Sequence, residues 1–200
     1  MSLRTTQAFI CALVLLLASS SSYRLAAQTP AFPGAQGFGG YATGGRGGTV
    51  YHVTTTNDSG PGSFRDAVSV SGRTVVFDIG GIIDYQPPRY APKPNITIAG
   101  QTAPGDGVTL YGNGLSFSGS HNNIVRFIRV REGINGDSGT DAMGIANGHD
   151  MIFDHITSSW GRDETFSING AVDNITIQSA IISQGLQGHS AAVSFRQMVA

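Results

Sequence analysis

Charged side chains are scarce in this chain. They account for 12% of its 200 residues, with 12 lysines and arginines against 13 aspartates and glutamates. This balance excludes the basic surface on which nucleic-acid binding depends, and the length predicts a single domain. Because so few carboxylates are present, a segment that collects several of them calls for a partner. That partner is a cation, a sugar or a structural hydrogen-bond network.

Cysteine and long apolar runs are equally scarce. The single cysteine, Cys11, lies in an N-terminal stretch with a basic residue, Arg4, an apolar run, Ala8–Ala18, and a small-residue cleavage point at Ala26–Ala27. This pattern is typical of a secretory signal over residues 1–27, and the apolar run is too short to span a bilayer. We therefore expect a secreted, extracellular protein that has no membrane contact after signal cleavage. Without cysteines, its core and hydrogen bonds must hold it together.

Helical periodicity is absent from every long window. The exception is Ser63–Val70, whose apolar residues Phe64, Ala67 and Val68 share one helical face and whose first residue pairs with Asp66 as in a capping box. The other ordered segments read as short β-runs bounded by Gly, Asn, Asp or Pro. These runs are Thr49–Val53, Thr74–Ile79, Ile96–Ala99, Val108–Tyr111, Ile124–Val130, Met151–Ile156 and Ile175–Ile182.

Four of these runs form a repeat. Each is entered by a small polar residue, Asn95, Asn123, Asp150 or Asn174, and the entries recur at a nearly constant interval. The length of this interval is typical of a solenoid, and strands in place of helices make each turn a rung of a parallel β-helix. A β-sandwich is the competing interpretation, but its turn signals usually recur at much shorter intervals. We expect the helix at Ser63–Val70 to cover the N-terminal end of the tube, where strand edges need protection.

The segment Asp137–Ile168 concentrates the acidic residues. Asp141, Asp154, Asp163 and Glu164 lie there among small and β-branched residues. The separation of Asp141 and Asp163 along the chain is close to one turn of the repeat, so a β-helix places them on neighbouring rungs. The plainer alternatives are that Asp141 caps a turn and that Asp163 and Glu164 form a solvated acidic pair.

Three segments are long enough to be specific for a family. They are AFPGAQGFGGYATGGRGGTVYHVTTTNDSGPGSFRDAV from Ala31, TIAGQTAPGDGVTLYG from Thr97, and DAMGIANGHDMIFDH with SWGRDE in the acidic segment. Together they resemble the secreted pectate lyases, from about Ala31 to Ser190. The resemblance implies an all-β fold, a right-handed parallel β-helix with a short N-terminal capping helix. It also implies bound Ca²⁺ and β-elimination of polygalacturonate in plant cell-wall pectin, with the whole protein acting as a monomer.

The resemblance assigns roles to the acidic residues. Asp141 matches the calcium ligand of the family's Asp-Ala-Ile motif, Asp163 matches a second ligand, and Glu164 is expected to share that role. Calcium is a hard cation that takes several oxygen ligands. Between substrate and protein carboxylates it neutralises the charge that develops when the C5 proton of galacturonate is removed. Some relatives carry a further aspartate where this chain has Ser167, so we expect a weaker site or a larger role for Glu164.

Three other positions have competing interpretations. Trp160 and His189 are the candidates for contact with substrate, although a tryptophan at such a position also serves in turn packing. Asp154 and His155 follow an apolar strand and suggest an acid–base pair. A structural network is the better interpretation there, because the resembled mechanism does not use a histidine base. We expect Asp137 to be a turn residue.

The base of the resembled family is an arginine in an Arg-x-Pro-type motif on a later rung, and no arginine in this chain matches it. We therefore expect the 200 residues themselves to be an inactive fragment, incomplete at its C-terminal end. Two alternatives have other chemistry. A noncatalytic polysaccharide-binding β-helix needs no base, and a pectin lyase needs no calcium because its substrate is esterified.

The last ten residues suggest why the motif is missing. Relatives commonly continue after His189 and Ser190 with Cys-Gly-Gly-Leu-Ile-Gln-Thr-Asp-Gly-Gly. Codons for that run, read without the first base of the cysteine codon, can encode Ala-Ala-Val-Ser-Phe-Arg-Gln-Met-Val-Ala, which is Ala191–Ala200. We therefore expect a β-helix domain over residues 28–190 and an out-of-frame tail over residues 191–200.

Resequencing the locus across the codon for Ser190 tests this hypothesis. We expect one additional base, or a genomic deletion whose repair restores the family's reading frame. An intact frame, with no related gene that reads through, would contradict it.

Overall fold

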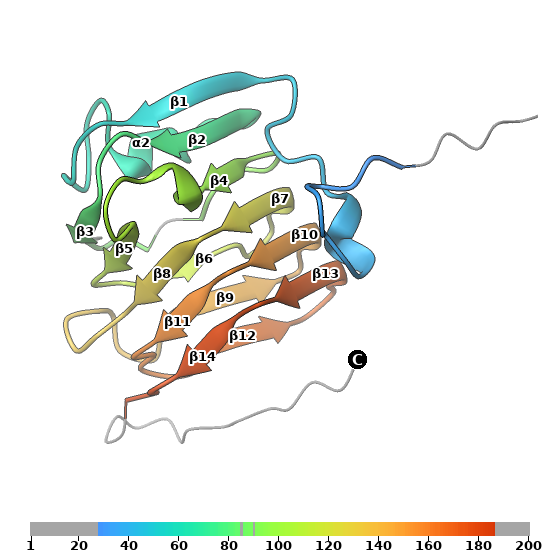
Figure 1. The fold of residues 1–200 in the computed structure, drawn as a ribbon. Helices are drawn as coiled ribbons and strands as arrows, with labels where there is room; N and C mark the ends of the chain where they lie inside the picture. Colours follow the sequence, from blue (N-terminus) through green and yellow to red (C-terminus); the bar gives the residue numbers. More distant parts are fainter. Residues whose placement is uncertain (1–27, 85, 90, 187–200) are drawn as a thin grey trace, which may run out of the picture.

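The computed structural model describes residues 28–84, 86–89 and 91–186, and in it the chain coils into a tube with three parallel β-sheets as its walls (Figure 1). The first sheet contains β1 (Thr49–Val53), β2 (Arg73–Phe77), β4 (Thr97–Ala99), β7 (His121–Arg126), β10 (His149–Asp154) and β13 (Asp173–Gln178). The second contains β3 (Gly81–Asp84), β5 (Val108–Tyr111), β8 (Ile128–Arg131), β11 (Thr157–Ser159) and β14 (Ile181–Ser183). The third contains β6 (Leu115–Ser116), β9 (Met143–Ala146) and β12 (Phe166–Asn169).

Every strand pairs in parallel with the strand one turn away. In the first sheet, equivalent positions on successive turns are occupied by Thr74, Thr97, Ile124, Ile152 and Thr176. The predicted parallel β-helix is therefore confirmed, and the sandwich interpretation is wrong. In the described part of the chain, no helix is both long enough and apolar enough to cross a bilayer.

The predicted strands belong mostly to the first sheet, and two of them were predicted too long. Ile124–Val130 and Ile175–Ile182 are each two strands, because Phe127 and Ser179 adopt a left-handed conformation with φ of 54° and 50°. A single left-handed residue turns the chain from the first sheet to the second. Five strands lay outside the prediction, because they are short and carry little alternation of apolar and polar residues: β3, β6, β9, β11 and β12.

The small polar residues at the start of the repeats occupy left-handed corners, and one of the four predicted positions needs correction. Asn95, Asp150 and Asn174 have φ between 52° and 59°, as the corner requires. Asn122, not Asn123, holds this position on the intervening turn, with φ of 54°. The side chains stack along the tube: Asn122 Nδ2 donates to Asn95 Oδ1 at 2.7 Å, and Asn174 Nδ2 donates to Asp150 Oδ1 at 2.8 Å.

Asn123 is fully buried and has a different task. Its Oδ1 accepts a hydrogen bond from the backbone N–H of Ile96 at 2.8 Å, and its Nδ2 donates to Ser120 Oγ at 2.6 Å. It therefore satisfies the backbone of the previous turn from inside the tube, where an unpaired N–H would be costly.

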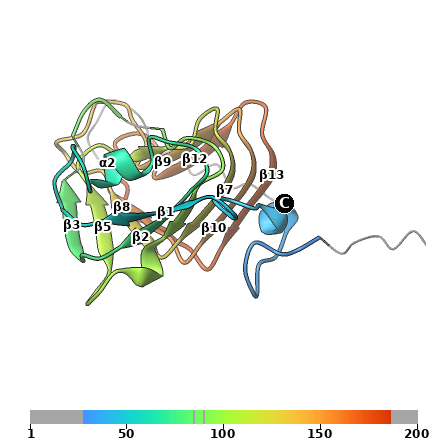
Figure 2. The ribbon, with the colours of Figure 1, turned by 90° about the horizontal axis from the view of Figure 1, so that it is seen from above.

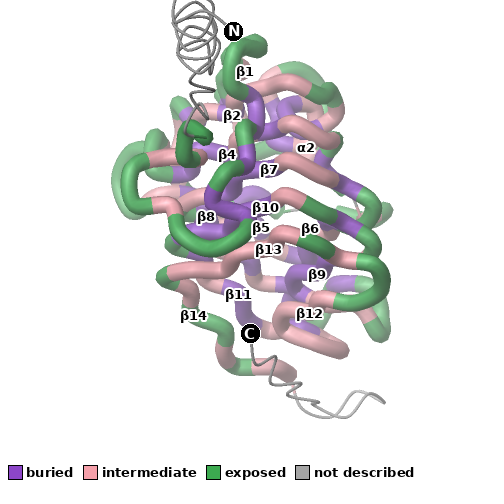
Figure 3. The backbone as a smooth tube through the Cα atoms, turned by 90° about the vertical axis from the view of Figure 1, so that its right-hand side faces the viewer, coloured by how far each residue is buried: buried purple, intermediate pink, exposed green. Residues whose placement is uncertain are grey.

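The core is a column of aliphatic and aromatic side chains inside the tube, and buried residues recur on successive turns of the backbone (Figure 3). The ring centroids of Phe117 and Phe153 are 5.0 Å apart and those of Phe153 and Phe166 are 5.6 Å apart, both edge to face. These contacts join Phe153 of β10 and Phe166 of β12 to Phe117, which follows β6 two repeats earlier, so the core is continuous from turn to turn. Such aromatic pairs add roughly 1 kcal/mol beyond their buried area.

The predicted helix is present but shorter than expected. It spans α2 (Phe64–Ala67), and Ser63 Oγ accepts a hydrogen bond from the N–H of Asp66 at 3.1 Å, as in the predicted cap. Phe64, Ala67 and Val68, the predicted apolar face, are fully buried. The Phe64 ring stacks on Phe77 of β2 at 6.0 Å, so α2 covers the core at the β1 end of the tube (Figure 2).

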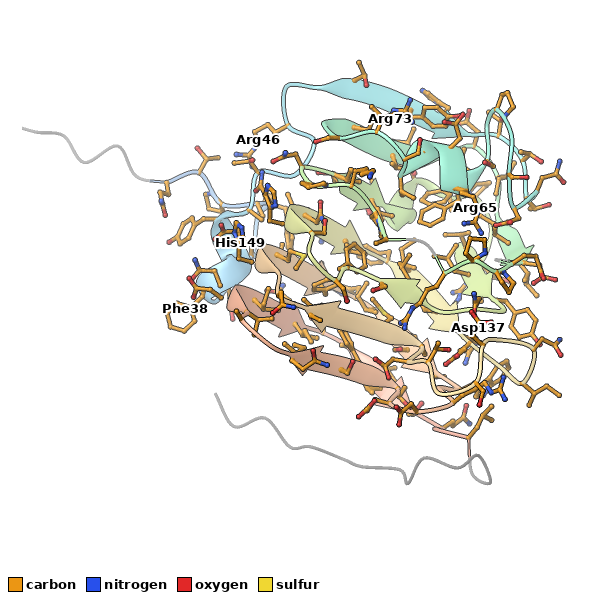
Figure 4. The ribbon with its side chains drawn as sticks, turned by 180° about the vertical axis from the view of Figure 1, so that it is seen from behind. Phe38, Arg46, Arg65, Arg73, Asp137 and His149 are labelled. Carbon is orange, nitrogen blue, oxygen red and sulfur yellow. The ribbon has the colours of Figure 1, made fainter. Side chains whose placement is uncertain are left out.

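The glycine-rich segment before β1 lies across the outer face of the first sheet. Its 3₁₀ helix η1 (Phe38–Tyr41) packs beside β10 and β13 (Figure 1). A Cβ atom on Gly39 would lie 2.0 Å from the carbonyl oxygen of Met151, and one on Gly45 would lie 2.2 Å from that of Arg73. Glycine is therefore required at both positions, since any side chain would push the segment off the sheet. Phe38 itself points outward and is 80% exposed (Figure 4).

Asp154 and His155 form a structural network at the corner after β10. The Asp154 carboxylate accepts hydrogen bonds from Arg126 Nε at 2.7 Å and from Gln178 Nε2 at 2.9 Å, and His155 Nδ1 lies 3.0 Å from it. Burial alone raises the pKa of Asp154. The hydrogen bonds from Gln178, His155 and Arg126, with the charge of Arg126, more than offset this effect and leave the pKa below its ordinary value. The network agrees with the structural interpretation of this pair.

We expect Asp154→Asn to lower the free energy of unfolding by about 2 kcal/mol at pH 7, because the substitution removes a buried, charge-assisted acceptor shared by two turns. Urea denaturation measures the change. Asp78→Asn is the matched control, since Asp78 is half exposed and pairs only with the exposed His52, and we expect a change within about 0.5 kcal/mol. Equal losses in the two variants would contradict this role.

Candidate metal centre

Two loops of neighbouring turns carry the acidic residues to one place. Asp141 lies two residues before β9, and Glu164 lies two residues before β12. Because Met143 of β9 pairs with Phe166 of β12, the register sets Asp141 beside Glu164. Asp163 is instead level with Thr140, and its N–H donates to the Thr140 carbonyl at 2.9 Å. Asp141 and Asp163 therefore lie on neighbouring turns, as predicted, and the residue level with Asp141 is Glu164.

The three carboxylates form one cluster. Asp141, Asp163 and Glu164 are partly buried, and a carboxylate oxygen of each lies within 4.8 Å of the others. The Glu164 N–H donates to Asp141 Oδ1 at 3.1 Å, so the backbone of one turn orients the carboxylate of the turn before it. Ser167 Oγ donates to Asp141 Oδ2. The serine that departs from the family pattern thus lies in the cluster and contacts its first member.

Like charges shift the protonation of the cluster. The pKa of Glu164 is raised from 4.5 to about 7, first by its hydrogen bond with the Asp141 carboxylate, then by burial and by the charges of Asp141 and Asp163. A carboxylate behaves this way when too little positive charge lies near it. A bound cation would supply that charge in place of the proton.

The donor set is that of a hard cation. Among the described residues, this cluster is the one place where three acidic, histidine or cysteine side chains lie close enough to hold a metal ion. All of its candidate ligand atoms are carboxylate oxygens. Calcium and magnesium prefer such oxygens, whereas structural zinc sites use cysteine and histidine. The residues present therefore fit Ca²⁺.

Two further charged residues lie at the cluster and were missing from the prediction. Glu132 is fully buried directly after β8, and Arg89 Nη2 donates to the Asp141 carbonyl at 2.6 Å. The alternation of β8, in which Ile128 and Val130 point inward, extends to position 132 and could have identified an inward carboxylate. Arg89 follows two prolines in a loop, where no periodicity indicates its direction.

The other predicted positions lie apart from the carboxylates. Asp137 is an exposed turn residue on the loop between β8 and β9, where its N–H donates to Asn113 Oδ1 at 2.9 Å (Figure 4). The Trp160 ring packs edge to face on Tyr111 at 6.4 Å and beneath the Arg131 guanidinium at 4.9 Å. Its contacts are those of a turn residue. His189, the signal over residues 1–27 and the tail over residues 191–200 lie outside the described residues.

A surface cleft of about 550 Å³ lies on another wall of the tube, between the Gly100–Gly107 loop and the β8 and β11 strands. Phe127, Arg129 and His155 line it, and none of the three clustered carboxylates does. The cleft is therefore separate from the candidate metal centre.

Comparison with known proteins agrees with the predicted resemblance and with the fold. Over 160 residues, 80% of this chain, the sequence is 62% identical to "Probable pectate lyase C" of Aspergillus oryzae and 61% identical to that of Emericella nidulans. The chain belongs to the pectate lyase family. It spans 38% of the length of these relatives. No protein-family model matches the sequence.

The fold of this family member also resembles a solved structure. The crystal structure of jun a 1, the major allergen from cedar pollen, matches 70% of this chain and 46% of its own chain with a TM-score of 0.60 and 23% sequence identity. At this identity the likeness supports the fold alone.

We expect the raised pKa of Glu164 to make the metal-free protein less stable as pH rises. Between pH 4.5 and about 7 the folded chain retains a proton on Glu164 that the unfolded chain has lost, so the free energy of unfolding falls with pH in this window. Urea denaturation in chelator across this range, compared with Glu164→Gln, measures the contribution. The variant lacks the titrating group. The difference in free energy of unfolding, variant minus unaltered chain, should therefore increase as pH rises. A difference that stays constant with pH would contradict the assignment.

Proposed function

We propose that this chain is part of a secreted, calcium-dependent pectate lyase that cleaves polygalacturonate by β-elimination. The observation that carries the proposal is the all-oxygen cluster of Asp141, Asp163 and Glu164 in a β-helix whose relatives are named pectate lyases. Each of these carboxylates is proposed to be a calcium ligand. Secretion, the domain boundaries at residues 28–190 and the monomeric state of the whole protein are part of the same proposal.

The cluster fits the chemistry of this reaction. Removing the C5 proton of a galacturonate unit places negative charge beside an existing carboxylate, so the step needs positive charge at that carboxylate. Bound Ca²⁺ would supply it by neutralising the substrate acid. The residues of this chain hold the ligand oxygens in place: Ser167 and the N–H of Glu164 both donate to the Asp141 carboxylate. An esterified substrate has no such acid, so the cluster favours polygalacturonate over the methylated pectin of a pectin lyase.

No residue of this chain is proposed as the base. Arg126 is engaged with Asp154, Arg129 donates to Thr109 and Asp106, and Arg131 covers Trp160. These arginines are committed to the walls of the tube. Trp160 and His189 remain the proposed contacts with the polysaccharide, and Trp160 keeps that role only if its ring is reachable beside Arg131.

A noncatalytic, calcium-dependent polysaccharide-binding β-helix is the second candidate. The same carboxylates favour it, because they bind metal and substrate acid without needing a base. The two candidates differ in whether the polysaccharide is broken.

We expect the 200-residue chain to bind polygalacturonate only when Ca²⁺ is present and to release no unsaturated product. Retention on immobilised polygalacturonate measures binding, and ultraviolet absorbance of the 4,5-unsaturated ends measures cleavage. Asp141→Asn should abolish the retention, and Asp78→Asn, an exposed acid outside the cluster, should leave it unchanged.

The same assay on the product of the locus with the reading frame restored after Ser190 separates the two candidates. Chelator-sensitive product from that protein supports the lyase, and retention without product supports the binding module. Product from the 200-residue chain itself would contradict the absence of a base. Retention that chelator does not alter would contradict the calcium site.

A further inference from the structure

Glu132 lies beneath the acidic cluster and contacts both of the loops that build it. Its Oε1 accepts a hydrogen bond from the hydroxyl of Thr140, and its Oε2 accepts one from the backbone N–H of Arg162 at 3.0 Å. Thr140 directly precedes Asp141, and Arg162 directly precedes Asp163. One carboxylate therefore connects the two segments that carry the proposed ligands.

The surroundings of Glu132 are built to hold this carboxylate. It is fully buried, and the loop after β8 closes over it so tightly that a Cβ on Gly136 would lie 2.8 Å from Glu132 Cγ. A buried carboxylate is costly unless hydrogen bonds and opposite charge compensate it. Burial raises the pKa of Glu132 above its ordinary value, and the hydrogen bonds from Thr140 and Arg162 and the charges of Arg89 and Arg162 offset part of this effect.

The loops need such a connection because the carboxylates of the cluster repel one another. Three carboxylates within 4.8 Å repel one another when they are ionised, and they lie on connecting segments rather than within strands. Two backbone hydrogen bonds join the same segments, from Asp163 N–H to the Thr140 carbonyl and from Ala142 N–H to the Glu164 carbonyl. Glu132 adds two more contacts across this junction from inside the tube.

We propose that Glu132 is a positioning residue that holds the Asp141 and Asp163 loops at the separation that calcium binding requires. The inference rests on the proposed calcium site and adds a residue that is not itself a ligand. Partners that orient metal ligands typically change metal affinity by about 10- to 100-fold when they are lost.

The test is a calorimetric Ca²⁺ titration of the full chain, with thermal unfolding in chelator as a separate readout of the fold. Glu132→Ala removes both contacts and should weaken Ca²⁺ binding at least about tenfold. Glu132→Gln should restore most of the affinity, because its amide can accept from Arg162 N–H and donate to the Thr140 hydroxyl. Asp154→Ala is the matched control: it also removes a buried carboxylate that joins two turns, but at a different corner, and should lower stability without weakening Ca²⁺ binding.

Thr140→Val provides a second route if Glu132→Ala does not fold. It removes only the hydroxyl at a partly exposed position and should weaken Ca²⁺ binding in the same direction. Affinity unchanged in a folded Glu132→Ala, or in Thr140→Val when Glu132→Ala is unfolded, would overturn the proposal. So would a loss in Asp154→Ala equal to that in Glu132→Ala. If the unaltered chain does not bind Ca²⁺, the proposed calcium site fails together with this inference, whereas normal binding in all variants overturns the inference alone.

Discussion

In-register parallel pairing between successive turns is the interaction on which the rest of this molecule depends. It places residues that are one turn apart in the sequence directly beside one another, and it repeats along the tube. The aromatic column of Phe117, Phe153 and Phe166, the side-chain stacks at the corners and the network around Asp154 all follow from it. The acidic cluster follows from it too, because Asp141 and Glu164 are neighbours only through the pairing of β9 with β12.

The pairing also explains how a chain with few charged residues gathers three carboxylates in one site. Only 12% of the chain is charged, yet two loops deliver three carboxylates to one point. A flexible chain could not hold them there against their repulsion, and a rigid stack of turns can. The hydrogen bond with Asp141, burial and the charges of Asp141 and Asp163 together raise the pKa of Glu164, and Ser167 donates to the Asp141 carboxylate.

Much of the fold could be predicted from the sequence because its period is visible where strands are long. The first sheet carries apolar runs and corner asparagines, so the repeat, the helix cap at Ser63 and the β-helix itself were predictable. The third sheet was not, since β6, β9 and β12 are very short and their burial depends on neighbouring turns. For the same reason the neighbouring turns of the cluster could be predicted, but not the register that sets Asp141 beside Glu164. The loops between the sheets differ in length, so the number of residues per turn is not constant and the sequence does not give the register. Arg89 contacts the cluster from a loop with no periodicity.

The most direct test is a crystal structure of the chain grown with calcium at neutral pH. We predict one calcium ion bound by carboxylate oxygens of Asp141, Asp163 and Glu164 at about 2.3–2.6 Å, with Glu132 still joined to Thr140 and Arg162. Calcium bound elsewhere on the tube would contradict the site. Three carboxylates without an ion at millimolar calcium, with Asp141 and Glu164 sharing a proton, would contradict it equally.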